Sequence, residues 1–391
     1  MGDLKKTMEN NFSQQQDIFE QQDIGLSAET ITDSNEKITE LSKKGYQLLK
    51  ENDTEGARAA FMSILDIEEN NNYALVGLGD IARKQNDFNE AIAYYNRCLS
   101  YYPSNNYALF GLADCYKALN QFSKAIDIWQ QYLMHDDKNI TVITRVADAY
   151  RKTKDFKKSK ELYLKVLDME KDNPYALIGL GHLSYDFKEY KDALYYWTRI
   201  YDLNQDNSDI RVLTAIGNCH RKLKTFEKGT YYFEKALYRD PKNFYALFGL
   251  ADCYRGMGQQ IKSIEYWNKI LEIDPRNKVI LTRAGDAYRT TGNYEEAVIY
   301  YNKALEIDFD IYAAIGLALV CKCQGKTDEA ITRFKTLIQN DPRNSRLYVD
   351  LAECYIQCNK TDEAIKILEN FLKNDGKNMQ IKNLLERIKR H

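Results

Sequence analysis

Proline, glycine and histidine are scarce in this sequence. Its 391 residues include 5 Pro, 19 Gly and 4 His. Proline and glycine interrupt helices, so their scarcity favours a long, mostly helical chain. The few histidines stand in no recognisable relay with serine or cysteine, and no glycine-rich phosphate-binding loop is present. We therefore expect a protein that is not an enzyme and that carries no cofactor.

Long apolar runs and an excess of one charge are also missing. The longest apolar run, YAAIGLALVC at residues 312–321, is too short to span a bilayer, and the first twenty residues lack the apolar segment of a signal peptide. We expect a cytoplasmic protein with no membrane insertion. The 55 basic and 57 acidic residues leave a net charge of −2, which offers no basic surface, so no nucleic-acid partner is expected.

The eight cysteines favour reduced thiols rather than disulfides, since no secretion signal accompanies them. Four cysteines gather near the C-terminal end and could suggest zinc. They are Cys321, Cys323, Cys354 and Cys358. They form no paired CxxC knuckle and have no histidine nearby, so no metal site is expected.

What the chain does have is an internal repeat of 34 residues. The string YALFGLADCY occurs at residues 107–116 and again at residues 245–254, and this separation is four periods plus a two-residue insertion. Ten units follow one another: 38–71, 72–105, 106–139, 140–173, 174–207, 210–243, 244–277, 278–310, 311–344 and 345–378. Residues 1–37 are expected to be disordered or weakly helical, and residues 379–391 to form a capping helix.

Three positions of the repeat carry its packing pattern. Positions 8 and 20 hold Gly, Ala or Ser in all ten units, and position 24 is aromatic in nine of them. Each unit also has two apolar segments of helical spacing. Small residues allow two antiparallel helices to approach closely, and the large ring then fills the space toward the next pair. Four of the five prolines stand at position 32, where they end the second helix.

This pattern resembles the tetratricopeptide repeat family. The resemblance implies an all-α fold, a right-handed α-solenoid superhelix of antiparallel helix pairs with a C-terminal capping helix. It also implies that the first helix of each pair lines a concave groove, through positions near 2, 5, 6, 9, 12 and 13. In the family's clamp for chaperone tails, Lys or Arg and Asn occupy specified groove positions. Here position 9 is mostly Asp, with Asn218 the one Asn, so binding of chaperone tails is not expected.

From the third unit onward two kinds of unit alternate, which gives the chain a second period of two units. Position 6 is Gly in five units, whereas two other units carry Arg145 and Arg283 there. The five glycines are Gly77, Gly111, Gly179, Gly249 and Gly316. Glycine within a helix costs about 1 kcal/mol relative to alanine, so these glycines need a reason. Two explanations are open. A neighbouring aromatic ring could pack closely against each glycine, or the missing side chains could expose the helix backbone to a ligand.

Acidic and basic residues alternate along the first helices. Positions 9 and 12 are three residues apart and therefore share a helix face, and RVADAYR (145–151) and RAGDAYR (283–289) place Arg, Asp and Arg in one row. The candidate groove residues are Tyr107, Phe110, Asp114, Lys117, Arg145, Asp148, Arg151, Arg221, Tyr245, Phe248, Asp252, Arg255, Arg283, Asp286 and Arg289. They could pair across helices and hold the stack in register, or they could bind a partner, since Arg grips carboxylates bidentately.

Three functions remain open from the sequence. The favoured one is a protein-interaction scaffold or adaptor that binds an extended peptide or a partner's helix in the groove. The second is a structural subunit of a larger assembly, with contacts through the outer face and the termini. The third is an RNA-binding solenoid, which the acidic row and the net charge argue against.

Overall fold

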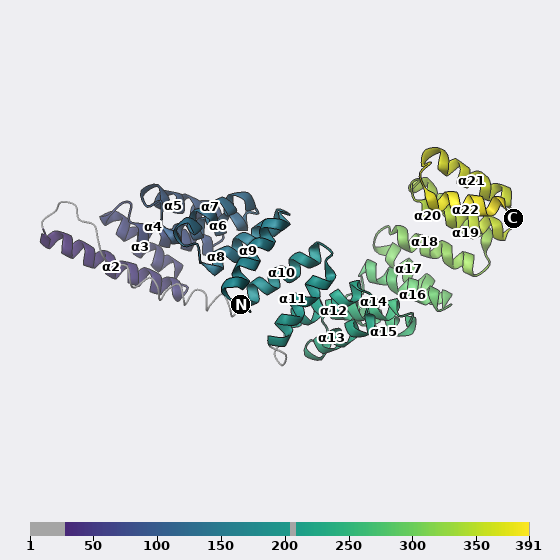
Figure 1. Ribbon diagram of the computed structural model, residues 1–391, viewed down its shortest axis with the longest axis horizontal. Helices are drawn as coiled ribbons and strands as arrows, with labels where there is room; N and C mark the ends of the chain where they lie inside the picture. The colour runs from purple at the N-terminus through teal and green to yellow at the C-terminus, as the bar shows by residue number, and fades with distance from the viewer. Residues whose placement is uncertain (1–27, 204–208, 391) are drawn as a thin grey trace. The chain divides into compact units, whose positions relative to one another are not determined.

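Helices follow one another along the whole described chain. The computed structural model describes residues 28–203 and 209–390, and within these ranges it contains helices and no strand (Figure 1). The N-terminal helices are α2 (Ala28–Lys50), α3 (Thr54–Ile67), α4 (Asn72–Lys84), α5 (Phe88–Tyr101), α6 (Asn106–Ala118), α7 (Phe122–His135), α8 (Ile140–Lys152) and α9 (Phe156–Met169). They are followed by α10 (Pro174–Asp186), α11 (Tyr190–Leu203), α12 (Ile210–Lys222), α13 (Phe226–Arg239), α14 (Phe244–Gly256), α15 (Gln260–Ile273) and α16 (Lys278–Thr290). The last helices are α17 (Tyr294–Ile307), α18 (Ile311–Cys323), α19 (Thr327–Asn340), α20 (Ser345–Gln357), α21 (Thr361–Asn374) and α22 (Met379–Lys389).

The chain forms two compact units, residues 1–162 and 163–391. In the first unit each helix from α2 to α8 packs against the next, and in the second unit the same holds from α10 to α22. The even-numbered helices from α2 to α20 are the first helices of the pairs, and first helices of adjacent pairs also touch, as α4 and α6 do in one unit and α12 and α14 in the other. The prediction of an all-α solenoid of helix pairs is confirmed.

Local sequence explains where many first helices begin and where the chain turns within each pair. The side chain of Asn105 accepts a hydrogen bond from the backbone N–H of Ala108 at 2.9 Å and caps α6, and Asn243 caps α14 in the same way. Between the two helices of every pair, one residue adopts a left-handed backbone conformation. These residues are Asn52, Asn86, Asn120, Lys154, Lys188, Lys224, Gly258, Gly292, Gly325 and Asn359. They all fall at position 15 of the repeat, where the chain reverses direction.

The aromatic ring at position 24 packs between two first helices. Tyr95 shows the arrangement: a Cβ atom added to Gly79, in its own repeat, would lie 2.6 Å from the ring, and one added to Gly111, in the next repeat, would lie 2.4 Å from it. Phe233 lies between Gly217 and Gly249 in the same way. The position-6 glycines are therefore covered by neighbouring rings, and the idea that they expose backbone to a ligand is wrong.

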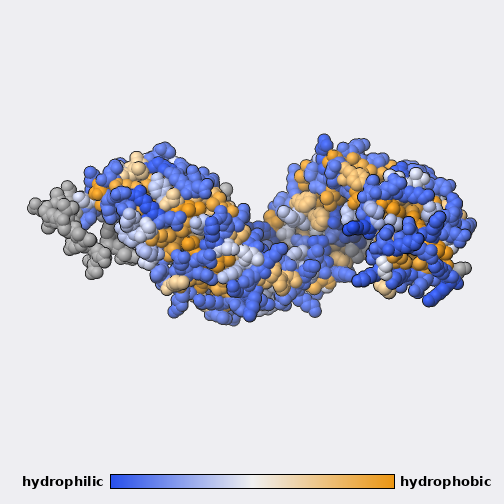
Figure 2. Space-filling model, turned by 90° about the horizontal axis from the view of Figure 1, so that it is seen from above, coloured by the Kyte–Doolittle hydropathy of each residue, from blue (hydrophilic) through white to orange (hydrophobic). Residues whose placement is uncertain are grey.

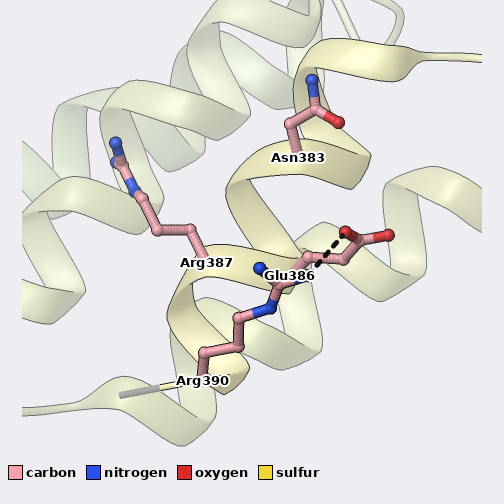
Figure 3. A pocket seen from close by; sticks show the side chains of 4 residues that line it. All are labelled: Asn383, Glu386, Arg387 and Arg390. Carbon is pink, nitrogen blue, oxygen red and sulfur yellow. Dashed lines mark ion pairs between the residues drawn. The ribbon is translucent and has the colours of Figure 1, made fainter.

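The two ends of the described chain are helical. Helix α2 begins at Ala28 and so includes the last ten residues of the segment expected to be disordered or weakly helical, while residues 1–27 lie outside the described residues. At the other end, Ile381, Leu384 and Ile388 of α22 join the apolar core under α20 and α21. Polar groups occupy the opposite side of α22, where Asn383, Glu386, Arg387 and Arg390 line a hollow of about 360 Å³ (Figure 3).

Polar residues make up much of the visible surface (Figure 2). The ion pair between Arg390 and Glu386, at 3.7 Å, lies on α22. On the face seen in Figure 2, hydrophilic residues predominate and hydrophobic ones gather in separate patches. No helix within residues 28–203 and 209–390 is long and apolar enough to cross a membrane.

Candidate functional site on the first helices

The candidate residues lie on the first helices of the pairs, in two groups. We call the side of these helices that carries repeat positions 2, 6, 9 and 12 the first-helix face. One group belongs to α6 and α8 in the first unit, and the other to α12, α14 and α16 in the second unit. Each group surrounds one copy of YALFGLADCY, and each copy places one aspartate among arginines, Asp114 and Asp252.

The Asp114 centre joins three first helices. Asp114 on α6 accepts a hydrogen bond from Nη1 of Arg145 on α8 at 2.6 Å, and Nη1 of Arg83 on α4 lies 3.9 Å from its other oxygen. Arg83 is held more closely by Asp80 of its own helix, at 2.9 Å. The guanidinium of Arg145 also stacks 4.7 Å from the centre of the Phe110 ring. The Asp114 centre is therefore a network of two carboxylates and two guanidinium groups.

Lys117 completes the Asp114 centre on α6. Burial, together with the positive charge of Arg145, lowers the pKa of the Lys117 ammonium, and nearby Asp114 and Asp148 only partly offset this. Tyr107 lies about one turn before Phe110 on α6 and is 38 % exposed. Arg151 and Asp148 lie further along α8 and form a pair at 3.8 Å.

The Asp252 centre holds one carboxylate among three guanidinium groups. Asp252 on α14 contacts Arg221 of α12 at 2.6 Å, Arg255 of its own helix at 2.7 Å and Arg283 of α16 at 3.3 Å. Burial acts to raise the pKa of the Asp252 carboxyl, but hydrogen bonds and charge from Arg255 and Arg221 outweigh it and lower the pKa. The sequence pattern placed Arg283 in one row with Asp286 and left open that acids and arginines pair across helices; the structure pairs Arg283 with Asp252 of the neighbouring helix.

Aromatic rings accompany the Asp252 centre. The Phe248 ring lies 5.1 Å from the guanidinium carbon of Arg283 and 5.9 Å from that of Arg221. Phe244 lies 6.0 Å from Phe248 and 5.7 Å from Tyr245 between ring centres. Phe244 is 41 % exposed and Tyr245 69 % exposed, so part of this ring cluster faces solvent.

Some residues of the network were not predicted as part of it. Tyr301 is the aromatic residue at position 24 of its repeat. Its hydroxyl donates a hydrogen bond to Asp286 at 2.8 Å and accepts one from Arg289 at 3.4 Å. Tyr95 donates to Asp80 at 2.7 Å in the same way. Position 24 was recognised only as a core ring. The signal available in the sequence was Tyr at position 24 in three of the four repeats that carry Asp at position 9 and Arg at position 12; the fourth, with Asp252 and Arg255, carries Trp267.

The remaining chemistry of the first helices is that of a core. Burial raises the pKa of the thiols of Cys115 and Cys253 to about 12, so both stay protonated. Within the described residues, no group of three or more His, Cys, Asp or Glu side chains is placed to hold a metal ion.

Four family models of the tetratricopeptide repeat match the chain. They cover residues 43–99, 82–147 and 140–173 in the N-terminal part, and residues 210–243, 244–308 and 324–388 in the C-terminal part. The chain belongs to the tetratricopeptide repeat family. Proteins of this family are generally scaffolds for protein interaction.

Solved structures with tetratricopeptide folds resemble parts of this repeat protein. MamA is 26 % identical, over 41 % of this chain and 94 % of its own, with a TM-score of 0.39. YrrB, described as a TPR protein with an unusual peptide-binding site, is 18 % identical over 47 % of this chain and 95 % of its own, with a TM-score of 0.42. PilF of Pseudomonas aeruginosa is 15 % identical over 55 % of this chain and 96 % of its own, with a TM-score of 0.47. A comparison with curated protein sequences gave no match.

Proposed function

We propose that this tetratricopeptide repeat protein is a non-catalytic scaffold that binds a segment of a partner protein along its first-helix face. The observation that carries the proposal is the combination of exposed tyrosines with half-buried arginines on one side of the first helices. In the second unit Tyr175, Tyr245 and Tyr312 stand at position 2 and are 57 %, 69 % and 66 % exposed. Exposed aromatic rings beside arginine are typical of protein-binding surfaces.

The arginines give this face its chemistry. Arg221, Arg255 and Arg283 expose 18 %, 47 % and 35 % of their side chains. They are therefore partly desolvated and already held by Asp252, so little side-chain entropy is lost when a ligand binds. A partner segment that lies across α12, α14 and α16 would meet rings and guanidinium groups together.

A second candidate function is that of a structural subunit that makes its contacts through the second helices. It is favoured by three exposed tyrosines on α11 and α13. Tyr195, Tyr231 and Tyr238 are 60 %, 51 % and 92 % exposed. These three side chains provide a matched control for the three on the first helices, because number and residue type are the same and all six are more than half exposed.

The test compares two triple variants of the full chain. One carries alanine for Tyr175, Tyr245 and Tyr312, and the other carries alanine for Tyr195, Tyr231 and Tyr238. Proteins retained from native lysate are quantified by mass spectrometry, and circular dichroism checks that both variants fold. We expect the first variant to lose the partners and the second to keep them. Loss only in the second variant would contradict the proposal and support the structural subunit.

A further inference from the structure

The Asp252 centre carries more positive charge than its aspartate neutralises. Three guanidinium groups contact one carboxylate, and arginine stays protonated in proteins. The other partners of Arg221, the side-chain carbonyl of Asn218 and the hydroxyl of Tyr185, are neutral. Asp286 is the acidic residue of α16. It forms an ion pair with Arg289 at 3.6 Å and accepts a hydrogen bond from Tyr301. Counting these two residues as well, four arginines stand against two aspartates.

The excess charge is held close together and partly away from water. Asp252 exposes 9 % of its side chain. Burial, and the repulsion from Arg255 and Arg221, lower the pKa of Arg283, while Asp252 and Asp286 offset only part of this. The guanidinium groups therefore repel one another across a single anion. A second anion placed among them would relieve this repulsion.

Asn218 is the residue that leaves the charge in excess. It stands at position 9 of its repeat, three residues before Arg221, and its side-chain oxygen accepts hydrogen bonds from Nε and Nη2 of Arg221 at 3.2 and 3.1 Å. In the first compact unit, the repeat that precedes YALFGLADCY holds Asp80 at this position, and Asp80 pairs with Arg83. An aspartate in place of Asn218 would place a negative charge in contact with Arg221.

Hydrogen-bond donors remain for a ligand. Arg255 contacts Oδ1 of Asp252 through Nε at 3.1 Å and Nη2 at 2.7 Å. Its Nη1 takes no part in these contacts, and the side chain is 47 % exposed. A guanidinium presents five N–H donors in a planar fork that fits a carboxylate. Phe244 and Tyr245, on the first turn of the same helix, offer exposed ring surface.

We propose that the Asp252 centre binds the carboxylate of an acidic protein segment, in which an aspartate or glutamate stands close to an apolar or aromatic residue, and that Asn218 makes the centre available to it. This inference rests on the proposed binding of a protein at the first-helix face. The carboxylate pairs with Arg255 and Arg283, and the apolar neighbour packs on Phe244 and Tyr245. A carboxylate is favoured over the phosphates of RNA, because Asp252 and Asp286 interrupt the basic residues along the face and a continuous polyanion would meet them.

The test uses a fluorescent peptide of alternating glutamate and tryptophan, and a control peptide with glutamine for each glutamate. Affinity is measured by fluorescence anisotropy for the wild-type chain, Asn218→Asp and Asn218→Ala, and circular dichroism confirms folding. We expect the wild type to prefer the glutamate peptide, Asn218→Asp to weaken its binding roughly tenfold, and Asn218→Ala to retain it. The alanine variant separates the added charge from the loss of the amide.

Three results would overturn the inference: no measurable binding of the glutamate peptide, equal affinity for the two peptides, or equal affinity of the wild type and Asn218→Asp. Tighter binding of an oligouridylate, with the same sensitivity to Asn218→Asp, would also overturn it and point to RNA. These failures are separate from failure of the proposed function. If Asn218→Asp changes nothing but the first-helix tyrosine variant still loses its lysate partners, then the scaffold proposal stands and only the acidic segment is excluded.

Discussion

The two copies of YALFGLADCY fold alike but carry different charges. In both, the glycine at position 6 lies under an aromatic ring of the preceding repeat: Gly111 under Tyr95 and Gly249 under Phe233. In both, the phenylalanine stacks against an arginine of the next first helix. The aspartates differ. Asp114 has one close guanidinium, at 2.6 Å, whereas Asp252 has three within 3.3 Å.

The difference originates outside the repeated string. Asp80 in the first unit corresponds to Asn218 in the second, and Lys117 corresponds to Arg255. Asp80 draws Arg83 away from Asp114, whereas neutral Asn218 leaves Arg221 to Asp252. Identical strings therefore provide the same packing, and the neighbouring repeat decides their electrostatics.

The largest expected effect is the loss of the aspartate at each centre. Asp252→Asn should destabilise α14 by about 3 kcal/mol, because it leaves three partly buried guanidinium groups without their anion. Asp114→Asn should cost about 1.5 kcal/mol, because Arg83 keeps Asp80. Hydrogen exchange of the amides in α14 and α6 measures both values in the full chain. Equal losses at the two positions would contradict the difference between the centres.

Alanine at the two position-6 glycines should have similar effects. Gly111→Ala and Gly249→Ala each place a Cβ atom within 2.4 Å of a buried ring. Each should destabilise its unit by about 2 kcal/mol, since forced repacking outweighs the gain in helix propensity. Urea unfolding followed by circular dichroism checks this. A neutral or stabilising effect at either glycine would mean that ring contact does not explain these residues.

A smaller effect is expected at the two phenylalanines. Phe248→Leu removes contacts with Arg221, Arg283 and Trp267, whereas Phe110→Leu removes contacts with Arg145 and Tyr132. We expect Phe248→Leu to cost about 1 kcal/mol more than Phe110→Leu, because it loses a second guanidinium contact. Thermal unfolding of the two variants gives the comparison, and a larger loss for Phe110→Leu would reverse it.

The packing could be predicted from the sequence because every repeat needs residues of the same size at the same positions. The small residues at positions 8 and 20 and the ring at position 24 recur in nearly every unit, so the helix pairs and their family follow from them. The ring contact at the position-6 glycines was one of two explanations weighed, and the structure chose between them.

The network of charges could not be predicted from spacing alone. Pairing across helices was one of two readings left open, but the spacing did not say which residues pair: the structure joins Arg145 and Arg283 to Asp114 and Asp252 of the preceding first helix. Such pairing depends on the distance between helices, which a single helix does not encode. The left-handed residue at position 15 was missed for another reason: Asn, Lys and Gly share the position, so no single residue type marks it.

The most direct test of the account exchanges the charges of the two centres. A double variant, Asp80→Asn with Asn218→Asp, gives the Asp114 centre the excess of positive charge and adds to the Asp252 centre a negative charge that offsets one of its arginines. Hydrogen exchange with and without the glutamate and tryptophan peptide shows which helices the peptide protects. We predict protection of α12, α14 and α16 in the wild type, and of α4, α6 and α8 in the double variant. Protection that stays on α12, α14 and α16 in the double variant would contradict the claim that these two positions decide where an acidic segment binds.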